Sequence, residues 1–283
     1  MSAPTPTTTL AELSAATATC ASSGKQVRLG RIFGDDGRTV VLPVDHGTML
    51  GRVSGLEDPV EMMRAMLPLG CDAFLVGPGV ARRTAAMFAR RGAPARLLTV
   101  DTHWRDGDAG RSVLMTSLER AAALGVDAVK MLLPWDVPPG ERAATAALVG
   151  EVVGAADLHG IPVMVEPICL RLPRGDEAVA VEADGCRMAV ELGADIVKVA
   201  YPGRPEVLAT WCDELEVPVV VLGGPASGTT DDLCEMVAGA IAAGARGITI
   251  GRRIWQRPLP EATELLDRLV GIVHPDRAPS GRR

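Results

Sequence analysis

The feature that most constrains the fold is an eightfold alternation along the chain. From Arg38 onward, short apolar runs rich in β-branched residues alternate with Ala- and Leu-rich helical segments, with Gly, Pro or Asp at the turns. The runs begin about every 20 to 35 residues, the length of one strand-plus-helix unit. They are Thr39–Asp45, Ala73–Val76, Arg96–Asp101, Ala128–Leu132, Pro162–Glu166, Ile196–Ala200, Pro218–Leu222 and Gly247–Gly251. Eight such units predict an α/β fold, a single (β/α)₈ barrel or TIM barrel.

Similar turns precede four of the predicted strands. They lie at Leu69–Ala73, Leu124–Ala128, Leu192–Ile196 and Ala243–Gly247. In each, a glycine ends a predicted helix and the chain turns into the next strand. A doubly wound open sheet is the alternative, but the first strand runs into Pro43–Gly47 without a G-x-G-x-x-G turn. The sequence therefore favours the closed barrel.

The domain organisation follows from the same pattern. A chain of 283 residues accommodates one barrel of roughly 250 residues. We predict a flexible N-terminal arm or short added helix at 1–24, the barrel at 25–274 and a disordered tail at 275–283. The Thr- and Ala-rich start has neither the basic nor the continuous apolar region of a signal peptide. No run approaches the ~18 apolar residues of a membrane span, so we expect a cytoplasmic protein.

Charge and cysteine usage restrict the partners. The formal net charge is -6 and the basic residues are scattered, which argues against nucleic-acid or membrane partners. The six cysteines include no C-x-x-C pair and indicate reduced thiols. The four histidines lack metal-ligand spacing, so we expect neither a metal nor another cofactor.

Lys198 interrupts an otherwise apolar predicted strand. A buried ammonium must be ion-paired or lose its proton, and a neutral amine attacks carbonyl groups. Only three of the 29 basic residues are lysines, Lys25, Lys130 and Lys198, and these are candidates for positions that need a deprotonatable amine. Schiff-base chemistry at Lys198 is therefore the first hypothesis, and a purely structural ion pair is the alternative.

Four charged residues fall on the inward phase near the C-terminal ends of their strands, where barrels of this class carry their active sites. Counting by two along the strands selects Asp45, Lys130, Glu166 and Lys198. A single inward charge is compatible with a salt bridge that fills the barrel. Two lysines and two carboxylates at one mouth predict an active site.

The last two strands run into glycine-containing loops, which in barrels of this class often bind phosphate. Gly223 and Gly224 follow strand 7, and Gly251 and Arg252 follow strand 8. Glycines let backbone N–H groups approach an anion, and a short helix near Arg252 would direct its N-terminus at the anion. Tight turns without a ligand are the alternative. His46 is a candidate general base or a residue that orients its loop.

Two further segments follow predicted strands. Asp101–Trp104 follows strand 3 and Trp135-Asp136 follows strand 4. Both are candidates to line a substrate pocket at the mouth, with plain loops as the alternative.

These residues lie in motifs that resemble the class I aldolase family of archaeal-type fructose-1,6-bisphosphate aldolase and 2-amino-3,7-dideoxy-threo-hept-6-ulosonate synthase. The resemblance extends from Gly24 to Val273. Its motifs are residues 24–33, 44–47, 193–198, 223–225 and 251–257. It implies Lys198 as the imine-forming lysine, Asp45 as an active-site carboxylate, and Gly223, Gly224, Gly251 and Arg252 as phosphate ligands, with His46 beside them. It also implies a small phosphorylated sugar or ketose as substrate, and we expect a homo-oligomer.

One departure concerns the end of strand 5, where the archaeal-type relatives carry a tyrosine and this chain carries Glu166. Glu166 together with Lys130 is more similar to class I tagatose-1,6-bisphosphate aldolases. We therefore expect a metal-independent aldolase that cleaves fructose or tagatose bisphosphate, or joins a dihydroxyacetone-phosphate donor to aspartate semialdehyde. Glu166 is predicted to transfer the proton, with Asp45 and His46 as alternatives. Thiolase-like acyl transfer from a phosphorylated diketone and a non-catalytic phosphosugar-binding barrel are the rival functions.

Overall fold

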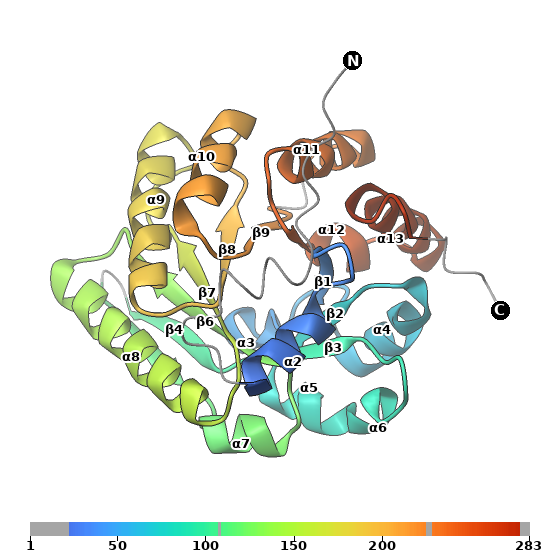
Figure 1. Ribbon diagram of the computed structural model, residues 1–283, viewed down its shortest axis with the longest axis horizontal. Helices are drawn as coiled ribbons and strands as arrows, with labels where there is room; N and C mark the ends of the chain where they lie inside the picture. The colour runs from blue at the N-terminus through green and yellow to red at the C-terminus, as the bar shows by residue number, and fades with distance from the viewer. Residues whose placement is uncertain (1–22, 107–108, 225–227, 278–283) are drawn as a thin grey trace.

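Eight parallel strands close into a barrel in the computed structural model, which describes residues 23–106, 109–224 and 228–277 (Figure 1). The hydrogen-bonded order is β1-β10-β9-β8-β7-β6-β3-β2, so each strand pairs with its neighbours in the predicted series. The strands are β1 Thr39–Pro43, β2 Ala73–Val76, β3 Ala95–Thr99, β6 Ala128–Pro134, β7 Val163–Ile168, β8 Ile196–Ala200, β9 Val219–Leu222 and β10 Gly247–Thr249. The predicted (β/α)₈ barrel is confirmed. Most of the predicted arm and tail, at 1–22 and 278–283, lies outside the described residues.

Helices surround the barrel (Figure 1). They are α4 Pro59–Met66, α5 Pro78–Arg83, α6 Ala85–Phe88, α7 Leu118–Ala123, α8 Pro139–Leu158, α9 Asp176–Glu191, α10 Pro205–Leu215, α11 Thr230–Ala242 and α13 Leu259–Val273. Shorter turns are α3 Gly47–Leu50, the 3₁₀ turn η1 Leu67–Leu69 and α12 Arg252–Trp255. Proline opens α4, α5, α8 and α10, where its fixed φ suits the first helical turn and its missing N–H has no cost.

The repeated glycine turns have the geometry that the sequence predicts. Gly70, Gly125, Gly193 and Gly244 have φ of 82°, 66°, 96° and 103°. Each glycine lies just after a helix and before the next barrel strand, in the left-handed conformation that glycine adopts without a steric cost. These turns explain why four of the strands begin where the sequence predicts.

The N-terminal end of the barrel is closed by α2, Ser23–Ile32. Its Leu29 and Ile32 join the cluster formed by the inward side chains of the lower barrel. Lys25 Nζ lies 2.8 Å from Asp195 Oδ2 and 2.6 Å from Asp157, which ties the helix to the loops of this end. From the sequence, Lys25 is a candidate for a position that needs a deprotonatable amine, but the two carboxylates hold it as a charged, structural residue.

The segment after β3 forms an antiparallel hairpin of β4, Asp101–Asp106, and β5, Ala109–Leu114. Thr102 donates a hydrogen bond to the carbonyl of Thr48 in α3, and Arg105 donates one to the carbonyl of Leu170 after β7. The hairpin therefore bridges two segments at the barrel mouth, which rules out the alternative of a plain loop at Asp101–Trp104. No helix in the described part of the chain is long and apolar enough to span a membrane.

Candidate active site

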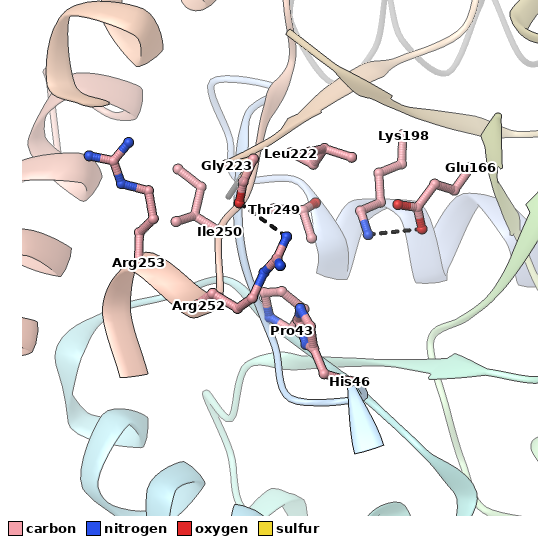
Figure 2. A pocket seen from close by; sticks show the side chains of 12 residues that line it. Pro43, His46, Glu166, Lys198, Leu222, Gly223, Thr249, Ile250, Arg252 and Arg253 are labelled. Atoms are coloured by element: carbon pink, nitrogen blue, oxygen red, sulfur yellow. Dashed lines mark hydrogen bonds and ion pairs between the residues drawn. The ribbon is translucent and has the colours of Figure 1, made fainter. Parts of the chain in front are cut away.

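Three inward side chains meet at the C-terminal end of the barrel, from β6, β7 and β8. Glu166 Oε2 lies 2.6 Å from Lys130 Nζ and 3.0 Å from Lys198 Nζ (Figure 2 shows the second contact). All three residues are buried. They are adjacent because β7 pairs with β6 on one side and with β8 on the other. One carboxylate oxygen thus lies between the two amines.

The charges of this triad stabilise one another against burial. Burial alone raises the pKa of Glu166, but Lys130 and Lys198 outweigh it and lower the pKa to about 2. Burial lowers the pKa of Lys130, but Glu166, Asp45 and Asp101 outweigh it and raise the pKa above its ordinary value. In the resting site Glu166 is therefore a carboxylate and Lys130 an ammonium.

Asp45 and His46 lie across the mouth from the triad, just after β1. Asp45 Oδ2 accepts a hydrogen bond from Thr99 at the end of β3, and its Oδ1 lies 3.7 Å from His46 Nδ1. The His46 ring packs edge-on against Trp255 with centroids 5.2 Å apart. Burial lowers the pKa of His46, and the cations Lys198 and Arg252 oppose the raising effect of Asp45. His46 is therefore a neutral imidazole near neutral pH.

Asp101 adds a third carboxyl to the mouth, and like Glu166 it is buried. Both of its oxygens accept from the backbone N–H of Leu132, at 3.2 and 3.1 Å. Burial raises the pKa of Asp101 to about 6, although Lys130 and the Leu132 N–H act in the opposite direction. Asp101 therefore titrates between mildly acidic and neutral pH.

The loops after β9 and β10 border a cavity that also reaches Lys198. Its space is about 390 Å³ including the open mouth, and Glu166, Gly223, Gly224, Gly251 and Arg252 are among its lining residues. Arg252 is the first residue of α12, and its Nη2 donates to the carbonyl of Gly224 at 3.3 Å. Figure 2 shows the Arg252 guanidinium across the cavity from the Lys198 amine. The cavity therefore has an amine at one side and a guanidinium at the other.

The glycines of this cavity have packing reasons of their own. A Cβ at Gly251 would lie 2.7 Å from the carbonyl oxygen of Pro43 and 2.8 Å from Trp255 Nε1. A Cβ at Gly223 would lie 2.9 Å from the Ile250 side chain. Gly224 has φ of 65°, and no atom of the described residues lies within 4 Å of its Cβ position. Of the three, only Gly224 therefore leaves space on its Cβ side among the described residues.

Residues 39–257 match the sequence profile of the DeoC/LacD family of aldolases. The chain belongs to this family. Its members are class I aldolases, which act through a Schiff-base lysine, and this chain is one of them.

Relatives in this family carry two kinds of name. The 2-amino-3,7-dideoxy-D-threo-hept-6-ulosonate synthase of Halobacterium salinarum is 33% identical over 260 residues, covering 91% of this chain and 94% of that protein. The class 1 fructose-bisphosphate aldolase of Thermoproteus tenax is 30% identical over 240 residues, covering 80% and 87%. The 2-amino-4,5-dihydroxy-6-oxo-7-(phosphonooxy)heptanoate synthase of Streptomyces griseus is 28% identical over 270 residues, covering 91% and 95%.

Solved aldolase structures share the fold. An archaeal fructose 1,6-bisphosphate aldolase superposes with a TM-score of 0.76 at 27% identity, covering 87% of this chain and 98% of that one. A second archaeal structure, with its catalytic lysine covalently bound to the carbinolamine intermediate of the substrate, gives a TM-score of 0.74 at 27% identity and the same coverage.

Some predicted residues of this aldolase lie away from the cavity. Trp135 packs against Gly185 of α9 and under the guanidinium of Arg142, in the layer between strands and helices. Asp136 accepts from three consecutive backbone N–H groups at 170–172, which fixes the loop after β7. The expectation that Trp135 lines a substrate pocket is wrong, because Trp135 continues the outward phase of Met131 and Leu133 and packs under the helices.

His103, in the hairpin, also lies apart from the cavity. Its Nε2 is 3.3 Å from Glu141 Oε1 on α8, and its Nδ1 is 3.1 Å from Ser112 Oγ. This contact attaches the hairpin to α8. Among the described residues, no group of three or more His, Cys, Asp and Glu side chains is arranged to hold a metal ion.

Sequence reasoning missed two inward hydroxyls of the aldolase mouth. Thr99 holds Asp45, and Thr249 lines the cavity with Lys198. Both would have been selected by the alternation that selected the charged residues. They were missed because only charged side chains were sought on the inward phase.

Proposed function

We propose that this class I aldolase forms a Schiff base between Lys198 and the ketone of a phosphorylated ketose or dihydroxyacetone-phosphate-type donor. The observation that supports the proposal most is the arrangement of Lys198 within one cavity. Its amine contacts Glu166, a base 3.0 Å away, and the same cavity is lined by Arg252. A nucleophile, a proton acceptor and an anion-binding cation are the groups that such a reaction needs.

The proposed reaction begins when Lys198 passes a proton to Glu166 and attacks the donor ketone. Glu166 returns that proton to the carbinolamine hydroxyl, which leaves as water. The iminium that remains withdraws electrons from the adjacent carbon–carbon bond. In the cleavage direction, Glu166 accepts the proton of the substrate hydroxyl as that bond breaks, an aldehyde leaves, and an enamine remains on Lys198. Protonation of the enamine and hydrolysis of the imine release the donor, and condensation is the reverse sequence.

In the resting site Glu166 is free of a proton because both flanking cations keep it ionised, with a pKa of about 2. Once Lys198 has lost its proton, one of the two charges that lower this pKa is gone, and Glu166 becomes a stronger base. Formation of the imine alters the contact between Lys198 and Glu166. The second cation, Lys130, lies 2.6 Å from Glu166 Oε2 and takes no part in the imine. Lys130 therefore favours the return of Glu166 to its ionised form after each proton transfer. Asp45, which accepts a hydrogen bond from Thr99, is the second carboxylate of the site and lies across the mouth from Glu166.

The phosphate of the donor is assigned to the loops after β9 and β10. Arg252 supplies the charge, and the open backbone at Gly224 lets main-chain N–H groups approach the anion. Gly223 and Gly251 shape this loop by their packing. His46, neutral and beside Arg252, borders the same cavity.

The substrate class follows from what two relatives' names have in common. A fructose bisphosphate and a 6-oxo-7-(phosphonooxy)heptanoate both carry a ketone with a phosphate on the neighbouring carbon. We propose that the site binds this unit, and that the reaction is either cleavage of fructose or tagatose bisphosphate or condensation with aspartate semialdehyde to a C7 product.

Borohydride reduction in the presence of dihydroxyacetone phosphate tests the proposal. Intact mass should show one donor covalently added, and peptide mapping should place it on Lys198. Lys198→Arg should abolish the adduct while the fold, checked by circular dichroism, is retained. An adduct on Lys130 would reassign the nucleophile, and no adduct at all would favour a phosphosugar-binding barrel. Assays with fructose 1,6-bisphosphate, tagatose 1,6-bisphosphate and donor plus aspartate semialdehyde then select the reaction.

A further inference from the structure

Thr249 is a polar residue of the mouth that the proposed reaction does not use. It ends β10 and pairs with Val41 of β1 and Leu222 of β9. Its neighbour Ile248 packs in the outer layer under the helices, so Thr249 lies on the inward phase. The residue is 2% exposed.

The Thr249 hydroxyl has no hydrogen-bond partner among the residues that the structure describes. Buried polar groups nearly always have one, from protein, water or ligand. Of the polar side chains that line the same cavity, Glu166 accepts from both lysines, whereas His46 Nδ1 also has no hydrogen-bond partner among the described residues. Thr249 Oγ1 is therefore an available hydrogen-bond donor on the strand that faces this cavity.

The position of Thr249 relates this hydroxyl to the donor. Thr249, Lys198 and Arg252 line one cavity, and Figure 2 shows Thr249 between the guanidinium and the amine. A ligand joined to Lys198 through its ketone carbon and held at Arg252 through its phosphate must run past Thr249. The part of the ligand that passes is the phosphate-bearing arm, which offers oxygen acceptors.

We propose that Thr249 Oγ1 donates a hydrogen bond to the phosphate-bearing arm of the bound donor, and so makes Thr249 a specificity-determining residue for phosphorylated donors. The inference rests on the proposed Schiff-base function. A β-branched side chain in a strand has few rotamers, so the hydroxyl is oriented before the donor arrives. With Arg252, it fixes how far the phosphate lies from the imine carbon, which favours donors with one carbon between ketone and phosphate.

Thr249→Val and Thr249→Ser separate the hydroxyl from the shape of the side chain. We measure borohydride trapping against concentration of dihydroxyacetone phosphate and of dihydroxyacetone. Thr249→Val should raise the concentration of dihydroxyacetone phosphate that gives half-maximal trapping roughly ten- to a hundredfold, the effect of one hydrogen bond to a charged group. The half-maximal concentration of dihydroxyacetone should not change. Thr249→Ser should stay within a few-fold of wild type for both donors, because the hydroxyl is retained.

Thr39 provides the matched control. It begins β1 at the opposite end of the barrel, is fully buried, and its hydroxyl likewise has no partner in the described part of the chain. Thr39→Val should leave trapping by both donors unchanged. An equal loss for the two donors in Thr249→Val, or no loss, would overturn this inference while wild-type trapping at Lys198 upheld the proposed function. Failure of the wild type to trap either donor would overturn both.

Discussion

Two lysines of the barrel mouth share a single carboxylate oxygen, that of Glu166, and in the proposed reaction Glu166 is the residue that transfers the proton. Glu166→Gln removes the base but keeps the shape. Positioned acid–base groups contribute about 10² to 10⁴ in rate, so turnover should fall by that factor while borohydride still traps the donor on Lys198. Steady-state kinetics and intact mass measure the two effects separately.

Glu182 supplies a comparison for that variant. It is 1% exposed on α9 and its carboxylate accepts from Arg174, so it is also a buried, cation-paired glutamate. Glu182→Gln should change stability but leave turnover near that of wild type. Near-normal turnover in Glu166→Gln would instead transfer the proton-transfer role to Asp45 or His46.

Arg252 is the guanidinium that separates phosphorylated from unphosphorylated donors in the proposed site. A charge-assisted contact to phosphate contributes about 1.5 to 3 kcal/mol. Arg252→Ala should therefore weaken the binding of dihydroxyacetone phosphate roughly ten- to a hundredfold. Dihydroxyacetone should be little affected, because it lacks the anion. KM values for the two donors decide the matter, and equal losses would mean that Arg252 only supports the Gly224 loop.

At the same scale, the sequence predicts charged residues of the mouth better than neutral ones. An inward lysine or carboxylate in an apolar strand is conspicuous because burying a charge is costly, so Lys130, Glu166 and Lys198 are selected directly. Thr249 is not conspicuous, since threonine is common in strands on either face. Trp135 lies on the outward phase, with Met131 and Leu133, so alternation along β6 indicates its direction better than its nearness to the strand end does.

Among the elements, α2 shows how a charged residue can serve the fold alone. Lys25 is 3% exposed and connects α2 to Asp195, which also accepts from the Val163 N–H at the start of β7. Burial lowers the pKa of Lys25, but Asp157 and Asp195 outweigh it, so the amine stays charged. The helix thus depends on an ion pair at the end of the barrel away from the catalytic mouth.

Lys25→Met tests this assignment. Removing one partner leaves the buried carboxylate of Asp195 without its cation, which should reduce the free energy of unfolding by about 3 kcal/mol. Trapping of the donor on Lys198 should be unchanged in the folded variant, since the two lysines lie at opposite ends of the barrel. Urea denaturation and borohydride trapping are the two measurements, and a loss of trapping with unchanged stability would contradict the structural role.

The predictability of an element depends on whether its pattern is local. The eight strands follow from apolar runs and glycine turns, both of which are set within a few residues. The β4–β5 hairpin does not, because its strands are polar and are held by contacts distant in sequence, such as Gly110 N to Glu141 and Thr102 to Thr48. Such contacts exist only once the barrel has closed.

Across the whole molecule, the two ends of the barrel differ in the kind of side chain that they bury. One end is filled by apolar side chains and covered by α2, and the other gathers buried ionisable groups from several strands. Since unfolding exposes all of these groups together, the pH dependence of global stability reports how the mouth holds them. Glu166, with a pKa of about 2, stabilises the fold above its ordinary pKa of 4.5, and this contribution is lost only as pH falls through 2.

Asp101 should change the free energy of unfolding with pH in the direction opposite to Glu166. Its pKa is about 6 in the fold and 3.8 ordinarily, so its contribution is fully present below pH 3.8 and is lost as pH rises through 6. Asp101→Asn cannot ionise, so the stability of this variant relative to wild type should increase between pH 4 and pH 7. The increase should be at most about 3 kcal/mol. Urea denaturation of both proteins at pH 4, 5, 6 and 7 measures it, and a constant difference would show that Asp101 ionises in the fold as it does in the unfolded chain.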